Sequence, residues 1–96
     1  MTRRAYTVVW DQDLSNDAAD FWMGASQEIR SEFSRACDEI DMTLASAPDS
    51  VGRQWQGLPD QFIWSLPGYS FSIVAVYRIN RGDRIVNVTR LHLSKT

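Results

Sequence analysis

The C-terminal third of the chain carries the clearest hydrophobic pattern, and it predicts β-strands. Runs rich in β-branched and aromatic residues are separated by Pro67-Gly68 and by the polar segment Asn80-Arg81-Gly82-Asp83. Such runs with turn residues between them are typical of consecutive antiparallel strands joined by tight turns. The three predicted strands cover residues 62–69, 71–79 and 85–92.

The second turn sets the predicted register of the last two strands. Placing Arg81 and Gly82 at its centre gives the pairs Tyr77 with Val86, Ala75 with Val88, Ile73 with Arg90, and Phe71 with His92. In this register Arg90 and His92 emerge where the helix-covered face of the sheet ends. A slip of one residue would move both side chains to the opposite face.

A short strand and a helix are predicted in the first quarter of the chain. Residues 6–10 are all strand formers, and residues 16–25 suit a short helix. Gly24 and the capping residue Ser26 favour a break after this helix. The candidate caps for its start are Asp13, Ser15 and Asn16.

A longer amphipathic helix follows this break. From Ile29 onward, apolar residues recur at steps of three or four, which places them on one face of a helix. Pro48 ends the helix near Ala47. One unbroken helix over residues 16–46 is the alternative interpretation, and residues 49–60 are predicted to form a loop.

These elements predict one α+β domain over residues 1–96. Its order is β-α-α-β-β-β, with a helical hairpin on one face of a small, mainly antiparallel sheet. A hydrophobic content of 44% is sufficient for a core. No apolar run has the length of a membrane span or a secretory signal, so a cytoplasmic protein is expected.

The composition argues against metal and cofactor chemistry. The only cysteine is Cys37, in a helical pattern that suggests a small buried side chain, and the only histidine is His92. A cysteine-rich or histidine-rich metal site is therefore not expected. Phosphate-binding glycine loops and serine nucleophile motifs are not found either, so no cofactor is predicted.

Charge is distributed unevenly along the chain. Residues 1–77 carry five basic against eleven acidic residues, a net charge of −6, whereas residues 78–96 carry five basic residues against Asp83, a net charge of +4. An anionic partner is therefore expected at the C-terminal strands. The alternative is that these charges solvate a strand edge and a turn. The basic residues concerned are Arg78, Arg81, Arg84, Arg90 and Lys95.

The order and spacing of three motifs resemble the RelE/ParE superfamily of bacterial type II toxins. The motifs are a helical stripe ending at Pro48 and followed by Gly52-Arg53, the segment Phe62-Ile63-Trp64-Ser65-Leu66-Pro67-Gly68-Tyr69, and Val76-Tyr77-Arg78-Ile79 with the following strand to His92. The resemblance covers nearly the whole chain. It implies a cytoplasmic toxin that a cognate antitoxin neutralises, and a target that is either DNA gyrase or mRNA on the ribosome.

The residues favour the ParE-like, plasmid-stabilisation branch and gyrase inhibition. Arg90-Leu91-His92-Leu93 is similar to the Arg-Tyr-His-Tyr ending of YoeB-like ribonucleases, but both tyrosines are leucines here. Residues 73–77 also lack the arginine that ribonuclease members usually carry, and such a donor stabilises the transition state. We therefore assign target binding to the five basic residues above.

Two other interpretations remain open at the level of sequence. The first is a ribosome-dependent mRNA endoribonuclease of the RelE or YoeB type, in which His92, Arg90 and Arg78 would be the catalytic residues. The second is a non-toxic binding protein that has kept the same fold, which the acidic balance of the chain favours.

Overall fold

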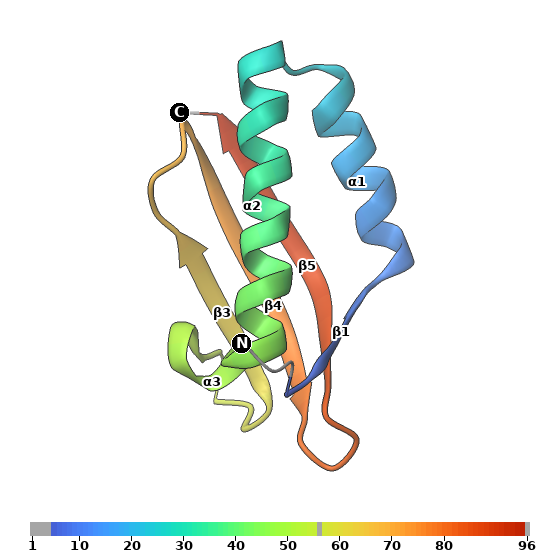
Figure 1. Cartoon of the computed structure of the whole chain (residues 1–96), viewed down its shortest axis with the longest axis vertical. Helices are drawn as coiled ribbons and strands as arrows, with labels where there is room; N and C mark the ends of the chain where they lie inside the picture. Colours follow the sequence, from blue (N-terminus) through green and yellow to red (C-terminus); the bar gives the residue numbers. More distant parts are fainter. Residues whose placement is uncertain (1–4, 56, 96) are drawn as a thin grey trace.

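The computed structural model describes residues 5–55 and 57–95 and contains a five-stranded sheet with two long helices on one face (Figure 1). The strand order is β1-β5-β4-β3-β2; β1 runs parallel to β5, and all other neighbours are antiparallel. The predicted α+β architecture is confirmed. The elements are β1 (Thr7–Trp10), α1 (Gln12–Met23), α2 (Gln27–Ser46), α3 (Pro48–Val51), β2 (Arg53–Gln54), β3 (Gln61–Leu66), β4 (Phe71–Asn80) and β5 (Ile85–Lys95).

The helical pair is broken where the sequence suggests. Ser26 caps α2, because its hydroxyl accepts a hydrogen bond from the Ile29 amide at 3.3 Å. The unbroken helix over residues 16–46 is therefore wrong. α1 begins four residues earlier than predicted, directly after Asp11, so the capping residues expected from the sequence lie inside it.

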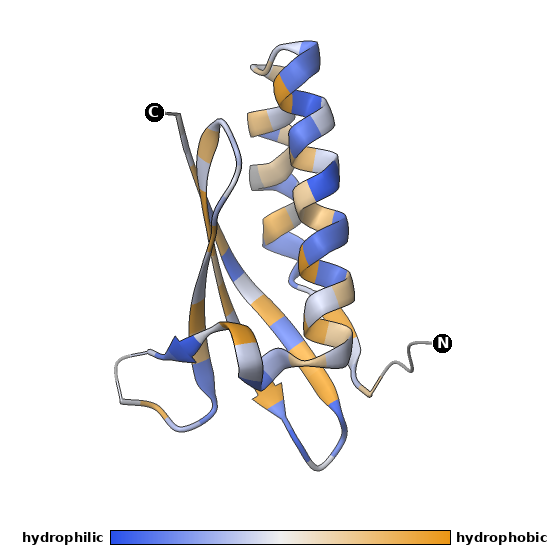
Figure 2. Cartoon of the chain, turned by 60° about the vertical axis from the view of Figure 1, so that its left-hand side comes forward, coloured by the Kyte–Doolittle hydropathy of each residue, from blue (hydrophilic) through white to orange (hydrophobic). Residues whose placement is uncertain are grey.

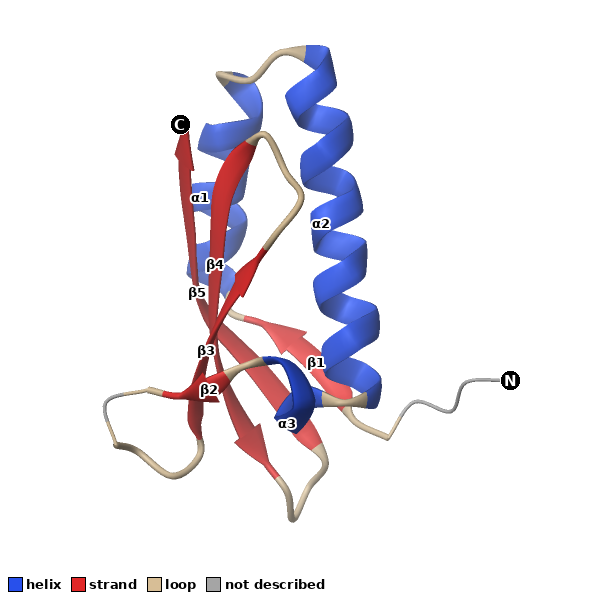
Figure 3. Cartoon of the chain, turned by 90° about the vertical axis from the view of Figure 1, so that its left-hand side faces the viewer, coloured by secondary structure: helices blue, strands red, loops and turns tan. Residues whose placement is uncertain are grey.

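The predicted loop over residues 49–60 contains two short elements. Figure 3 shows α3 following α2 and β2 lying beside β3. β2 pairs Arg53 with Ile63, and the buried Tyr77 hydroxyl donates a hydrogen bond to the Pro48 carbonyl at 2.7 Å. Elements of four and two residues have too little periodicity to be recognised in a sequence, and tertiary contacts hold them here.

The core lies between α1 and α2 and the inner face of the sheet. Figure 2 shows the hydrophilic residues of α2 mostly on the side turned away from the sheet. Burial removes about 25 cal/mol of unfavourable hydration per Å² of apolar surface, and this drives the packing of the two layers. The buried residues at the centre are Phe33, Ala36, Ile40, Leu44, Phe71, Ile73, Ala75, Tyr77, Val86 and Val88.

The predicted register between β4 and β5 is wrong, and there are two reasons. The turn contains four residues instead of two, since Asn80 pairs with Ile85 and the Asn80 side chain accepts a hydrogen bond from the Asp83 amide at 3.1 Å. Arg84 then adopts a left-handed conformation with φ of 55°. The second reason is a β-bulge, because Tyr77 pairs with Val88 but the preceding residue, Val76, pairs with Arg90.

The bulge changes the face on which the C-terminal residues lie. Thr89 is the extra residue on β5, and its hydroxyl donates a hydrogen bond to the Val76 carbonyl at 3.3 Å. Val88 and Leu91 both point to the helices, while Arg90 and His92 point to the other face.

In the described residues no helix is long and apolar enough to cross a membrane.

Candidate functional site

The sheet face that the helices leave uncovered is the candidate functional site, and we call it the open face. Residues on this face follow from the alternation of side chains along each strand and from the strand register. Its basic residues are exposed, whereas Val76 at its centre is buried beneath its neighbours. The side chains that point to it include Val9, Arg53, Ile63, Val74, Val76, Arg78, Asn87, Arg90 and His92.

One row of the open face carries an arginine at each end. Arg53 pairs with Ile63, Ile63 with Val76, and Val76 with Arg90, so these four residues cross β2, β3, β4 and β5 in line. Neighbouring strands lie about 4.8 Å apart, so three spacings separate the backbones at the two ends by about 14 Å. His92 lies two residues beyond Arg90 on the same face.

Sequence reasoning missed Arg53, since it assigned this residue to a loop. The signal that could have found it is the Gly52-Arg53 pair that belongs to the resembling motif. A Cβ atom at Gly52 would lie 2.4 Å from the Tyr77 hydroxyl and 3.0 Å from the Ile63 carbonyl. Only glycine allows β2 to approach β3 this closely, and the approach brings Arg53 to the open face.

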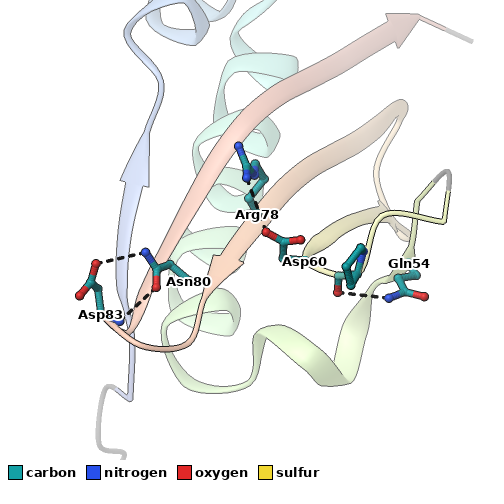
Figure 4. Close-up of polar contacts among 6 residues, drawn as sticks. Gln54, Asp60, Arg78, Asn80 and Asp83 are labelled. Atoms are coloured by element: carbon teal, nitrogen blue, oxygen red, sulfur yellow. Dashed lines mark hydrogen bonds and ion pairs between the residues drawn. The ribbon is translucent and has the colours of Figure 1, made fainter.

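Arg78 lies on the open face next to an acidic residue. Its Nη2 atom is 3.5 Å from Oδ2 of Asp60, which precedes β3 (Figure 4). The two side chains are 60% and 53% exposed, so water screens this ion pair strongly. Arg78 therefore pairs with an acid of the loop that precedes β3.

The other basic residues predicted to bind a target are not all close to one another. Arg81, in the turn after β4, forms an ion pair with Asp49 of α3, which raises the pKa of its guanidinium. Arg84 is exposed in the same turn. Lys95 pairs with Phe71 at the opposite end of β5, far along the strand from Arg84. The structure thus brings together Arg78, Arg90 and His92 on one face and separates Lys95 from the turn.

The opposite side of the molecule is acidic and holds the β3–β4 turn. The Glu32 carboxylate of α2 accepts hydrogen bonds from the Ser70 amide at 2.9 Å and the Ser70 hydroxyl at 2.7 Å, and these bonds lower its pKa. Glu39 accepts a hydrogen bond from the Tyr69 hydroxyl at 2.6 Å. Burial, with this bond, raises the pKa of Tyr69 to about 12.

Cys37 is a free, partly buried cysteine of α2. Burial raises the pKa of the Cys37 thiol to about 11, so it remains protonated at neutral pH. No group of three or more His, Cys, Asp or Glu side chains is arranged to hold a metal ion among the described residues. The guanidinium groups of the open face can bind a phosphate or a carboxylate, and its one imidazole can transfer a proton.

Comparison with known proteins gives matches among solved structures alone. No protein-family model and no curated protein sequence matches the chain. The isolated RelE toxin of Escherichia coli superposes with a TM-score of 0.55 and 18% identity, over 96% of this chain and 87% of that one. An arginine-to-alanine double mutant of the same toxin in the free state gives a TM-score of 0.51 and 18% identity, over 95% of this chain and 83% of that one.

The agreement extends along almost the whole chain. At 18% identity it establishes architecture and not activity. The resemblance seen in the sequence is confirmed at this level: the chain has the fold of the RelE toxin.

Proposed function

We propose that this chain is the toxin component of a type II toxin–antitoxin system and that it acts through the open face. The observation that carries the proposal is the gathering of Arg53, Arg78, Arg90 and His92 on one exposed sheet face of a RelE-like fold. The acidic helices lie on the other side. A molecule with this charge distribution presents one face to an anionic target.

One candidate target is mRNA on the ribosome, which was the alternative to gyrase in the interpretation of the sequence. Phosphate groups bind arginine through charge-assisted hydrogen bonds, and Arg90 and Arg53 at the two ends of one row suit a strand that crosses the sheet. Cleavage at a 2′-hydroxyl also needs proton transfer, and an imidazole is the usual group for it. In this mechanism Arg90 holds the phosphate and His92 donates or accepts the proton, with Arg78 as a second cation.

DNA gyrase, the target in the ParE-like branch, is the second candidate. The observation in its favour is the apolar centre of the open face, because Val74 and Val76 of β4 and Ile63 of β3 offer no hydrogen-bond donor to a transition state. An apolar centre with a polar rim is typical of protein interfaces. On this hypothesis the arginines form the rim of a protein-binding surface.

The proposal includes an antitoxin as the partner and the cytoplasm as the place of action. An antitoxin segment that covers the open face would neutralise either activity. Acidic side chains on such a segment would match Arg53, Arg78 and Arg90, since complementary charge fixes the register of an interface.

The test combines growth with two purified assays. Expression without a partner in a bacterial host should arrest growth, and His92→Gln and Arg90→Ala should relieve the arrest, whereas Asp20→Asn on α1 should not. Cleavage of mRNA on ribosomes, with gyrase supercoiling unaffected, supports the first target. Inhibition of supercoiling without cleavage supports the second. Normal growth on expression of a folded protein would contradict the proposal and favour a non-toxic binding protein of this fold.

A further inference from the structure

We propose that Arg78 belongs to an anion subsite for the backbone of a single nucleic-acid strand, and that the Asp60 carboxylate competes with the phosphate for Arg78. The subsite lies at the turn end of the open face. The inference deepens the proposed function, because it assigns a second phosphate position and a regulating carboxylate to the same face. It does not require that the chain be toxic.

A cavity of about 500 Å³ forms the subsite. Two of its lining residues are arginines, Arg78 and Arg81, and Asn87 lies directly across the strand pair from Arg78. Cavities of this size accommodate a nucleotide-sized group. The lining residues are Asp60, Arg78, Ile79, Asn80, Arg81 and Asn87.

A second hollow adjoins the first and shares Arg78 and Asn87 with it. It has a volume of about 200 Å³; Val9 forms an apolar part of its wall, and Trp10, Asp11 and Thr89 complete the lining. Val9 is 43% exposed. Bases of single strands pack against apolar and aromatic side chains while cations hold the backbone, so the pair of hollows fits one nucleotide unit. The phosphate would occupy the larger hollow and the base the smaller one.

Both arginines of the subsite are paired with acids of this chain. Arg78 contacts Asp60 at 3.5 Å (Figure 4), and Arg81 contacts Asp49. A phosphate must therefore replace a carboxylate at each guanidinium. At Arg78 the replacement is easy, because the ion pair is long and more than half exposed.

The position of Asp60 is fixed by the loop that carries it. Its carbonyl accepts a hydrogen bond from the Ile79 amide at 2.9 Å, and the carbonyl of the preceding Pro59 accepts one from the Gln54 side chain at 3.1 Å (Figure 4). The carboxylate thus stays at the mouth of the cavity when the ion pair breaks. The carboxylate and a bound phosphate therefore compete for the same guanidinium, so the effect of Asp60 on affinity requires Arg78.

The competition can be measured with the purified chain and a fluorescent 12-nucleotide single strand, as RNA and as DNA, at 50 mM and 150 mM salt. Asp60→Asn should bind about two- to fivefold more tightly, because an exposed ion pair of this kind is lost. Arg78→Ala should bind more weakly and reduce the slope of log K against log salt by about 0.7. Asp20→Asn, with the same change in net charge on the acidic side, is the matched control.

The double variant Asp60→Asn/Arg78→Ala separates competition from general charge effects. If Asp60 acts through Arg78, the double variant binds as weakly as Arg78→Ala alone. The inference would be overturned if Asp60→Asn raised the affinity no more than Asp20→Asn does, or if the rise in affinity persisted without Arg78.

Equal affinities for RNA and DNA would assign the subsite to phosphate, and a higher affinity for RNA would add a contact to the ribose hydroxyl. If the parent chain binds the oligonucleotide as expected but does not arrest growth, the toxin proposal is refuted and the subsite is not.

Discussion

Single residues in this protein determine how closely the strands approach one another. Gly52 is the clearest case, since the Tyr77 hydroxyl occupies the space where a side chain would begin. Tyr77 is fully buried, and burial raises its pKa to about 12. Its hydroxyl also donates a hydrogen bond to the Pro48 carbonyl, so it joins β4 to α3 beside Gly52, the residue before β2. A change at any of these positions affects the β2 edge of the open face.

We expect Gly52→Ala to destabilise the fold by about 1 to 3 kcal/mol, because the added methyl group must displace a buried hydroxyl and a backbone carbonyl. Urea unfolding measures the change. Gly24→Ala is the matched control, since its nearest contacts would be ordinary, at 3.9 and 4.0 Å. Equal stability of the two variants would show that β2 can move away from β3 without cost.

The limits of sequence reasoning also lie at this scale. The four longer strands and the amphipathic face of α2 follow from the hydrophobic pattern and were predicted, and Gly24 with the capping residue Ser26 predicted the break between the helices. The positions of Arg90 and His92 were not, because they depend on one bulged residue, Thr89, and on the left-handed Arg84. Neither feature leaves a periodic signal in the sequence, and a shift of one residue reverses a face.

At the scale of elements, the bulge determines what β5 presents on each side. Without Thr89, the chain passes from Val88 directly to Arg90 and the alternation of faces is regular. With Asn87 removed instead, Val88 would turn from the core to the open face. The two deletions are equal in length and differ in their consequence for the core.

Deletion of Thr89 should leave a folded protein with a melting temperature within about 8 °C of the parent, whereas deletion of Asn87 should cost about 3 kcal/mol or more through the loss of Val88 from the core. Thermal unfolding followed by circular dichroism compares them. If the Thr89 deletion unfolds and the Asn87 deletion does not, the register described here is wrong.

A second element-level contact attaches the β3–β4 turn to α2. Glu32 has a pKa below its ordinary value of 4.5 because of its bonds to Ser70, so its contribution to stability is complete above that value and is lost as the pH falls below it. Glu32→Gln should therefore be less stable than the parent at pH 7, and the difference should shrink by pH 3. Urea unfolding at both values provides the measurement, with Glu28→Gln as the control on the same helix. A difference that is independent of pH would contradict this contribution.

For the molecule as a whole, the separation of charge matters more than the net charge of −2. The acidic helices and the basic open face lie on opposite sides of the sheet, so an overall acidic chain can still bind a polyanion. The acidic balance of the sequence favoured a non-toxic binding protein, whereas the charge distribution along the chain predicted an anionic partner at the C-terminal strands. The fold agrees with the charge distribution, because α1 and α2 lie on the opposite side of the sheet from Arg53, Arg78 and Arg90.

Arg53→Ala should lower the salt dependence of oligonucleotide binding by about 0.7 in log–log slope, since one phosphate contact is lost. Arg35→Ala removes the same charge from α2, where the guanidinium lies over the Tyr69 ring, and should leave the slope unchanged. Fluorescence anisotropy over a range of salt concentrations distinguishes them. Equal slopes for the two variants would mean that binding depends on net charge and not on the open face.

The place of β5 between β1 and β4 also has a consequence for synthesis. While the nascent chain is still lacking residues 85–95, β1 has no neighbour in the sheet and β4 has a neighbour on one side alone. The same late segment carries Arg90 and His92. A product that ends before residue 85 would therefore lack both the complete sheet and the two residues that we propose to act on the target.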